Sequence, residues 1–282
     1  MRKIQSIIDH CSALYHDLSL GYVQAWKERH PGGRAIGYLP VYVPRELLHA
    51  AGMLPVGILG GGDQVEIIRG DAYYQSYICH IPRSIVELGL SGRLDPLDGM
   101  LCPSICDVIR NLSGVWQVSF PQKYVRYFDF PQNFRPEIGG MFYRQELLLF
   151  RGELEQLAGR AISDDALRES IRTYNANRRL VEQLYDLRSD RPWQVPTYEL
   201  YLLLRAGTIL AVEEHSRLLE DYLEAVQSVE REPLDNIRVV VEGVFCEQPP
   251  LGLIRALERS GCYLVDEDLV VVTRFLQGDL PT

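Results

Sequence analysis

The sequence predicts an α/β fold of two doubly wound domains with mainly parallel sheets, joined by a long helical segment. Short apolar runs alternate with helical patterns along the first half of the chain, as is typical of parallel sheets. Continuous helical periodicity follows, and a strand–helix–strand pattern returns near the end. We expect an N-terminal α/β domain at 1–138, a helical connecting segment at 139–232 and the start of a second α/β domain at 233–282.

The chain begins with a predicted helix followed by a β-α-β unit. From Ile4 to Leu18 the apolar residues recur at the three- and four-residue spacing of one helical face. Residues 34–62 then predict a strand, a short helix opened by Pro44 and closed at Gly52, and a second strand ending in three glycines. Those glycines fit neither a phosphate-binding loop nor a dinucleotide fingerprint, so they indicate a tight turn.

Two cysteines stand at predicted helix starts. The segment "IPRSIVELGLSG" is helical, and Pro82 fits only its first turn because proline cannot donate an interior backbone hydrogen bond. Cys79 is therefore expected at or just before that start. The next strand is "PLDGMLCP", and a helix is predicted to begin at Asp107, directly after Cys106. A further short strand is "KYVRYFDF".

Long helices are predicted from Gly139 to about Glu230. Ser163 is a plausible cap, and Gly207 is a possible break between two later helices. One apolar stripe after that cap contains Leu167, Ile171, Tyr174, Val181 and Tyr185.

The segments "IRVVVEGVF", "PPLGLIRALERSG" and "CYLVDEDLV" predict a final strand, helix and strand. Two parallel strands and one helix do not cover both faces of a sheet. We therefore expect either that a partner completes this unit or that the chain is a fragment of a longer protein.

Composition limits the classes of partner. The 29 basic and 38 acidic residues give a net charge of −9, so nucleic acid is not an expected partner. No N-terminal apolar signal region and no uncharged run of about 18 apolar residues occurs. A soluble cytoplasmic protein without membrane association is predicted. Thiols stay reduced in that compartment, so the six cysteines are possible ligands or buried residues rather than disulfides.

Cys79 and Cys106 are the main candidates for chemistry. In doubly wound sheets the reactive crevice lies outside the carboxyl ends of the strands. Unpaired N–H groups and the positive end of the helix dipole favour a thiolate at a helix start. The two thiolates are candidates to converge on one metal or iron–sulfur cluster. The alternative is that both are inert packed residues, as many free cysteines are.

The remaining cysteines divide between packing and ligation. Cys11 and Cys262 are expected in the core. Cys102 either packs at the strand end, which we favour, or stands near a cluster. Cys246 ends the first strand of the second unit and is a further candidate metal ligand.

The sequence contains no clear motif for another kind of catalysis. The segment "EEHSRLL" is not a zinc-protease motif, and no nucleophile elbow occurs. His80 is either a proton donor or a hydrogen-bonded structural residue. Arg83 and Arg110 either meet phosphates of a ligand or face solvent. No catalytic residue is assigned.

Five ordered blocks together carry a family resemblance. They are "YLPVYVPRELLHAAGMLPVGILGGG", "DAYYQSYICHIPRSIVELG", "DGMLCPSICDVIRNLSGVW", "KYVRYFDFPQNF" and "GVFCEQPPLGLIRALERSGCYLVDEDL". They resemble the 2-hydroxyacyl-CoA dehydratase/benzoyl-CoA reductase family and, within it, most closely the C (gamma) subunits of ATP-dependent benzoyl-CoA reductases. The resemblance spans nearly the whole chain, and the order and spacing of the blocks make it specific.

The resemblance implies an oxygen-sensitive oxidoreductase of anaerobic aromatic degradation. Two homologous subunits of such an enzyme bind the acyl-CoA and low-potential [4Fe-4S] clusters. Two further subunits hydrolyse ATP and pass on single electrons from ferredoxin, and benzoyl-CoA becomes a cyclic dienoyl-CoA. The alternatives are a 2-hydroxyacyl-CoA dehydratase subunit and a non-catalytic scaffold subunit of the same complex.

The resemblance also implies cluster ligands. Cys79 in "YIC" and Cys106 in "SICD" match the first two cluster cysteines of the family. A third ligand normally lies in a later C-terminal segment that this chain does not reach, and Cys246 does not match that segment. The resemblance therefore implies that 233–282 is truncated relative to the family.

Overall fold

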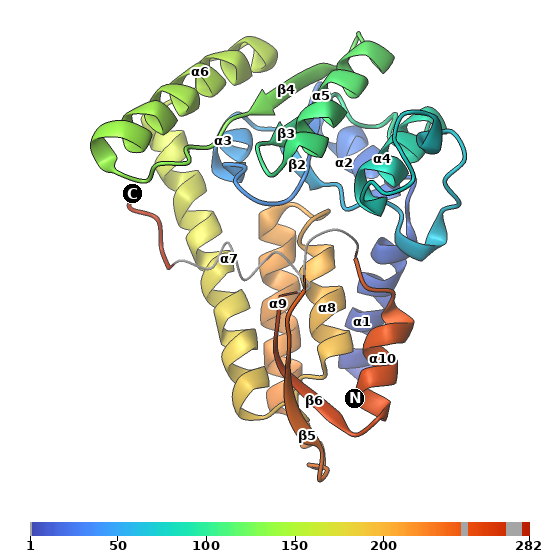
Figure 1. The fold of residues 1–282 in the computed structure, drawn as a ribbon. Helices are drawn as coiled ribbons and strands as arrows, with labels where there is room; N and C mark the ends of the chain where they lie inside the picture. The colour runs from blue at the N-terminus through green and yellow to red at the C-terminus, as the bar shows by residue number, and fades with distance from the viewer. Residues whose placement is uncertain (1, 244–247, 269–277) are drawn as a thin grey trace.

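The computed structural model describes residues 2–243, 248–268 and 278–282. In this part of the chain the fold is mixed α/β, and every paired strand is parallel to its neighbour (Figure 1). The predicted α/β class with parallel sheets is confirmed. The division into the three segments 1–138, 139–232 and 233–282 stays a prediction. None of the described helices is long and apolar enough to cross a membrane.

The larger sheet has the strand order β2-β1-β3-β4. Its strands are β1 (Ala35–Tyr38), β2 (Leu54–Gly57), β3 (Gly99–Pro103) and β4 (Tyr124–Phe128). The chain leaves β1 toward β2 on one side and returns to place β3 on the other side. A topological switch point therefore lies between the carboxyl ends of β1 and β3, where open α/β sheets bind ligands.

Helices cover both faces of this sheet. On one face α2 (Gly21–Arg29), α4 (His80–Leu90) and α5 (Asp107–Ser119) share a core cluster with the strands. On the other face α3 (Arg45–Ala50) and α6 (Met141–Ala158) share a second core cluster with the strands. The separation follows from strand alternation, which sends neighbouring side chains to opposite faces.

A bundle of helices lies beneath the sheet in the view of Figure 1. It contains α1 (Arg2–His16), α7 (Asp164–Asp190), α8 (Thr197–Ala206) and α9 (Val212–Gln227), which share one buried cluster. The predicted cap is confirmed, because Ser163 Oγ accepts a hydrogen bond from Ala166 N at 3.1 Å. The predicted break is confirmed as well, since α8 ends at Ala206 and α9 begins at Val212.

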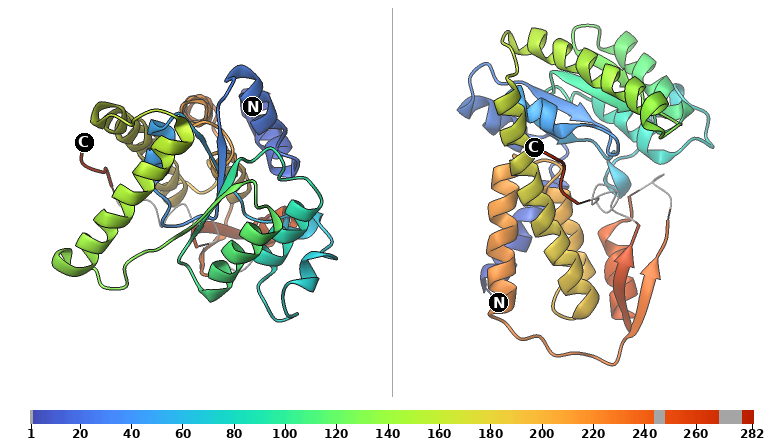
Figure 2. Two further views of the ribbon diagram at one scale, coloured as in Figure 1. Left: turned by 90° about the horizontal axis from the view of Figure 1, so that it is seen from above. Right: turned by 90° about the vertical axis from the view of Figure 1, so that its left-hand side faces the viewer.

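A second, two-stranded parallel sheet pairs β5 (Ile237–Val241) with β6 (Cys262–Glu267), connected by α10 (Leu251–Arg259). These elements lie beside the bundle (Figure 2). Thr197 Oγ1 at the start of α8 donates to Leu264 O of β6 at 3.2 Å. On β5, Ile237 and Val240 are exposed, so apolar surface of this small sheet remains open.

Short turns complete the fold. Two 3₁₀ turns, Gly62–Gln64 (η1) and Gly70–Ala72 (η2), lie between β2 and α4, and a π-turn, Pro136–Gly140 (η3), precedes α6. The glycine run after β2 forms the predicted tight turn, with positive φ at Gly60 and Gly62.

Candidate functional site

The start of α4 lies at the carboxyl end of β2, and Cys79 is its N-cap residue. Ser84 on the first turns of α4 accepts a hydrogen bond from Gly61 N, just beyond β2, at 3.2 Å. A Cβ at Gly60 would collide with Ser84 Oγ, so glycine is needed for this close approach. The approach fixes the helix start, and with it the half-buried Cys79, at this edge of the sheet.

Cys106 is the N-cap residue of α5, three residues after the end of β3. Its carbonyl oxygen accepts the first helical hydrogen bond, from Arg110 N at 3.1 Å, and the residue is exposed. In the described chain neither this thiol nor that of Cys79 accepts a capping hydrogen bond from its helix. Both predicted helix starts are confirmed, and both thiols belong to the carboxyl edge of the larger sheet.

Tyr74 is a residue of this edge that the sequence reasoning missed. Its ring packs against the core cluster that contains Cys102 of β3. Burial raises the pKa of Tyr74 well above its ordinary value, and charge on Cys102 and Cys106 raises this pKa further. The hydroxyl oxygen is buried and has no hydrogen-bond partner within the described chain. A buried donor without a partner is uncommon and calls for an explanation.

The other cysteines have simpler roles. Cys11 and Cys102 are fully buried, and burial raises the pKa of each thiol to about 12. Their predicted packing is confirmed. The predicted core position of Cys262 is wrong, because this residue at the start of β6 is only half-buried. Cys246, the further candidate ligand, lies outside the described residues.

The described residues at the carboxyl edge of the larger sheet include few possible metal ligands. Across residues 2–243, 248–268 and 278–282, no group of three or more His, Cys, Asp or Glu side chains is arranged to hold a metal ion. The two helix-start thiols have the donor chemistry that iron–sulfur clusters use. The Tyr74 hydroxyl, which has no hydrogen-bond partner in the described chain, lies within electrostatic range of Cys106 and is a donor of the kind that sulfur accepts. These residues therefore fit such a cluster as suppliers of part of its ligand set.

The candidate polar residues are placed as follows. Arg83 forms an ion pair with Asp71 at 2.7 Å, which ties α4 to η2. The exposed Arg110 lies over the ring of Tyr127 at 5.4 Å. His80 is the first residue of α4. The structure therefore gives Arg83 a structural partner.

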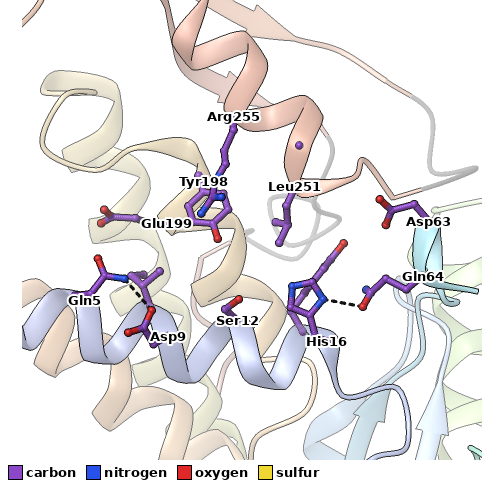
Figure 3. Close-up of a pocket in the computed structure, with 13 residues that line it drawn as sticks. Gln5, Asp9, Ser12, His16, Asp63, Gln64, Tyr198, Glu199, Leu251 and Arg255 are labelled. Atoms are coloured by element: carbon purple, nitrogen blue, oxygen red, sulfur yellow. Dashed lines mark hydrogen bonds between the residues drawn. The ribbon is translucent and has the colours of Figure 1, made fainter.

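A cavity of about 690 Å³ lies between α1, η1, α8 and α10 (Figure 3). Arg255 of α10 stacks over the ring of Tyr198 at 3.8 Å. His16 Nδ1 donates to Gln64 Oε1 at 2.7 Å and closes the side toward η1. None of the candidate cysteines in the described chain lines this cavity. It is a polar region distinct from the thiol edge.

Comparison with known proteins identifies relatives over nearly the whole chain. Residues 40–282 match the family model "2-hydroxyglutaryl-CoA dehydratase, D-component". The C subunit of benzoyl-CoA reductase from Thauera aromatica is 59% identical over 276 residues, which are 98% of this chain and 72% of that protein.

Two more distant relatives are dehydratase subunits. The (R)-2-hydroxyglutaryl-CoA dehydratase subunit beta of Acidaminococcus fermentans is 30% identical over 90% of this chain and 67% of its own length. The lactoyl-CoA dehydratase subunit beta of Anaerotignum propionicum is 29% identical over 88% of this chain and 65% of its own length. This chain thus spans about two thirds of the length of each of these two relatives.

Proposed function

The chain belongs to the 2-hydroxyglutaryl-CoA dehydratase, D-component family, and we propose that it is the substrate- and cluster-binding subunit of an ATP-dependent benzoyl-CoA reductase. The proposed reaction is reduction of the aromatic ring of benzoyl-CoA to a cyclic dienoyl-CoA by single-electron steps. The observation that carries the proposal is the position of two free thiols at the N-caps of α4 and α5, on one edge of the sheet. Greater similarity to a benzoyl-CoA reductase subunit than to dehydratase subunits favours this substrate.

Cys79 and Cys106 are the proposed protein ligands of a [4Fe-4S] cluster. Cys246 is proposed as a further ligand. When bound, such a cluster would supply single electrons, and cluster potentials reach about −700 mV at their negative extreme. A very negative donor is what adding an electron to an aromatic ring needs. The positive ends of two helix dipoles lie at the two cysteines and favour negative charge there.

Tyr74 has a supporting role in this proposal. We propose that its buried hydroxyl, without a partner in the described chain and within electrostatic range of Cys106, donates a hydrogen bond to a sulfur of the cluster. Hydrogen bonds to the sulfurs are among the factors that set a cluster potential.

The assembly is part of the proposal. We expect a homologous substrate-binding subunit, two ATP-hydrolysing subunits that pass on electrons, and ferredoxin as the donor, in the cytoplasm. ATP is hydrolysed on the partner subunits and not on this chain.

The proposal is tested on the complete complex, purified without oxygen. Cys79→Ser and Cys106→Ser are each expected to lose iron, acid-labile sulfide and reduction of benzoyl-CoA, because a hydroxyl is a poor replacement for a thiolate ligand. Cys262→Ser is the control, since this half-buried thiol lies on the second sheet. Retention of iron and of ring reduction in both test variants contradicts the assignment.

The same preparation separates the alternatives. A complex that eliminates water from a 2-hydroxyacyl-CoA and does not reduce benzoyl-CoA is a dehydratase. A complex in which this chain binds no iron, while the other subunits hold all of it, identifies a scaffold.

A further inference from the structure

The loop that follows β1 holds two residues in an unusual backbone conformation. Val41 has φ +85° and Tyr42 has φ +62°. This left-handed region is unfavourable for residues with a Cβ, and most unfavourable for β-branched ones such as valine. Strain of this kind persists where the surrounding structure enforces it, and it concentrates at functional sites.

The unusual conformation places the Tyr42 ring on the ring of Phe130. The two ring centroids are 4.3 Å apart and the planes differ by 17°, which is a stacked arrangement. Phe130 is held in turn, because its backbone N donates to Ser104 Oγ at 2.8 Å. The connections that follow β1, β3 and β4 are therefore joined through Tyr42, Ser104 and Phe130.

This stack borders the topological switch point. The loop that carries Tyr42 follows β1, and Ser104 directly follows β3, the neighbouring strand. Ser104 is also only two residues before Cys106, the N-cap of α5. The aromatic pair and the proposed cluster ligand thus flank the crevice in which open α/β sheets bind ligands.

Much aromatic surface is left open there. Tyr42 is 42% exposed, although its backbone has the unfavourable positive φ described above. Phe134, 75% exposed, continues the cluster at 6.0 Å from Phe130. Aromatic rings bind a further aromatic ring in offset or edge-to-face contact. A flat apolar group is therefore the ligand that this surface suits.

We propose that the Tyr42 ring, held on Phe130 by the strained loop, contacts the acyl group of the acyl-CoA and selects an aromatic acyl group. The inference rests on the proposed function and adds a specificity residue to it. A benzoyl group has the flat, uncharged ring that the open face of the stack accommodates, whereas a small aliphatic acyl group covers little of this surface.

Tyr42→Gly is the informative variant. Glycine adopts a positive φ without strain, so this change removes the ring and also relieves the backbone. We expect binding of benzoyl-CoA to the anaerobic complex to weaken by about tenfold, the range of an aromatic contact. Binding of acetyl-CoA should stay within about twofold, and the melting temperature should be unchanged or higher. A purely structural role of Tyr42 predicts the opposite pattern, a lower melting temperature with unchanged selectivity.

Two further variants complete the test. Tyr42→Phe keeps the ring and should keep the preference for benzoyl-CoA. Phe142→Ala removes an aromatic ring of α6 with the same 42% exposure and should leave both affinities unchanged.

The outcomes separate the two proposals. Wild-type binding of benzoyl-CoA together with unchanged selectivity in Tyr42→Gly overturns the inference alone. Loss of assembly of the complex in Tyr42→Gly with normal selectivity also overturns it and marks the ring as a contact between subunits. A wild-type complex that binds no benzoyl-CoA overturns the proposed function and the inference with it.

Discussion

Glu46 on α3 and Arg178 on α7 form a buried ion pair, with 2.7 Å between Glu46 Oε1 and Arg178 Nη1. A second contact joins the same elements, because Ser170 Oγ of α7 donates to Glu46 O at 2.8 Å. Glu46 lies four residues after Tyr42. The helical bundle thus holds the end of the strained loop in place, which is the kind of support that such a loop requires.

Removing one partner of this pair should be strongly destabilising. Glu46→Ala leaves the Arg178 guanidinium buried without its carboxylate, and we expect a loss of about 3 kcal/mol in the free energy of unfolding. Glu46→Met combined with Arg178→Met should lose less than the single variant, because no charge remains buried. Denaturant unfolding measures both. The control is Glu169→Ala, which breaks an exposed pair with Arg172 and should change stability by less than about 1 kcal/mol. Equal losses at the two sites would contradict the prediction.

His215 should make stability depend on pH. Its ring is buried, Asn177 Nδ2 donates to its Nδ1 at 3.0 Å, and its Nε2 donates to Leu203 O at 3.1 Å. Burial lowers the pKa of His215 from 6.5 to about 4. Between these values the unfolded chain binds a proton that the folded chain excludes, so stability falls as pH drops from 6.5 toward 4 and is complete above 6.5.

The magnitude expected for this loss is of order 3 kcal/mol. Unfolding at pH 7.5 and at pH 4.5 measures it, and His215→Gln, which cannot titrate, isolates the histidine. The variant is expected to be less stable at pH 7.5 but to lose less on acidification. An identical pH dependence in both proteins would show that other groups are responsible.

Tyr74→Phe should leave the chain without cofactor equally stable or more stable, by up to about 1 kcal/mol. The change removes a buried hydroxyl that has no partner in the described chain, and with it the penalty of desolvating that group. Tyr124→Phe is the matched control, because this hydroxyl donates to Glu153 at 2.5 Å and its loss should destabilise the chain by about 1 kcal/mol. Thermal unfolding of both variants gives the comparison. A clear loss in Tyr74→Phe would mean that its hydroxyl already has a partner.

Gly60→Ala should loosen the start of α4. The backbone has φ +76° and the added Cβ would collide with Ser84 Oγ, so a loss of at least about 1 kcal/mol is expected. Gly114→Ala is the contrasting change, since its Cβ would meet none of the described atoms within 4 Å and alanine favours the interior of α5. That variant should gain about 0.5 to 1 kcal/mol. Melting temperatures that fall in both variants would contradict this interpretation of the two positions.

Local signals in the sequence were sufficient for most elements. Ser163 and Gly207 marked real helix ends, and Pro82 placed the start of α4 correctly because its chemistry excludes an interior position. Helix α2 was missed, since only Val23 and Trp26 of its side chains are buried and its first N–H groups are satisfied from outside. The N–H of Gly21, the first residue of α2, donates to the side chain of Asp17, which lies four residues before the helix.

Features that depend on distant partners could not be predicted. The apolar stripe of α7 omitted Asn177, Arg178 and Arg188, which are buried because residues far away in the sequence face them. The same holds at the candidate site. Cys79 and Cys106 were found from helix starts, a local property. The Tyr74 hydroxyl without a partner in the described chain and the backbone strain at Tyr42 arise only when separate loops meet.

The paired starts of α4 and α5 also bear on how the proposed acyl-CoA substrate would arrive. The chain carries a net charge of −9, so it repels an anionic acyl-CoA at long range, while the two helix dipoles attract it only over the last few ångströms. Salt screens the distant repulsion more than the close attraction. Encounter with the thioester should therefore become faster, not slower, as ionic strength rises.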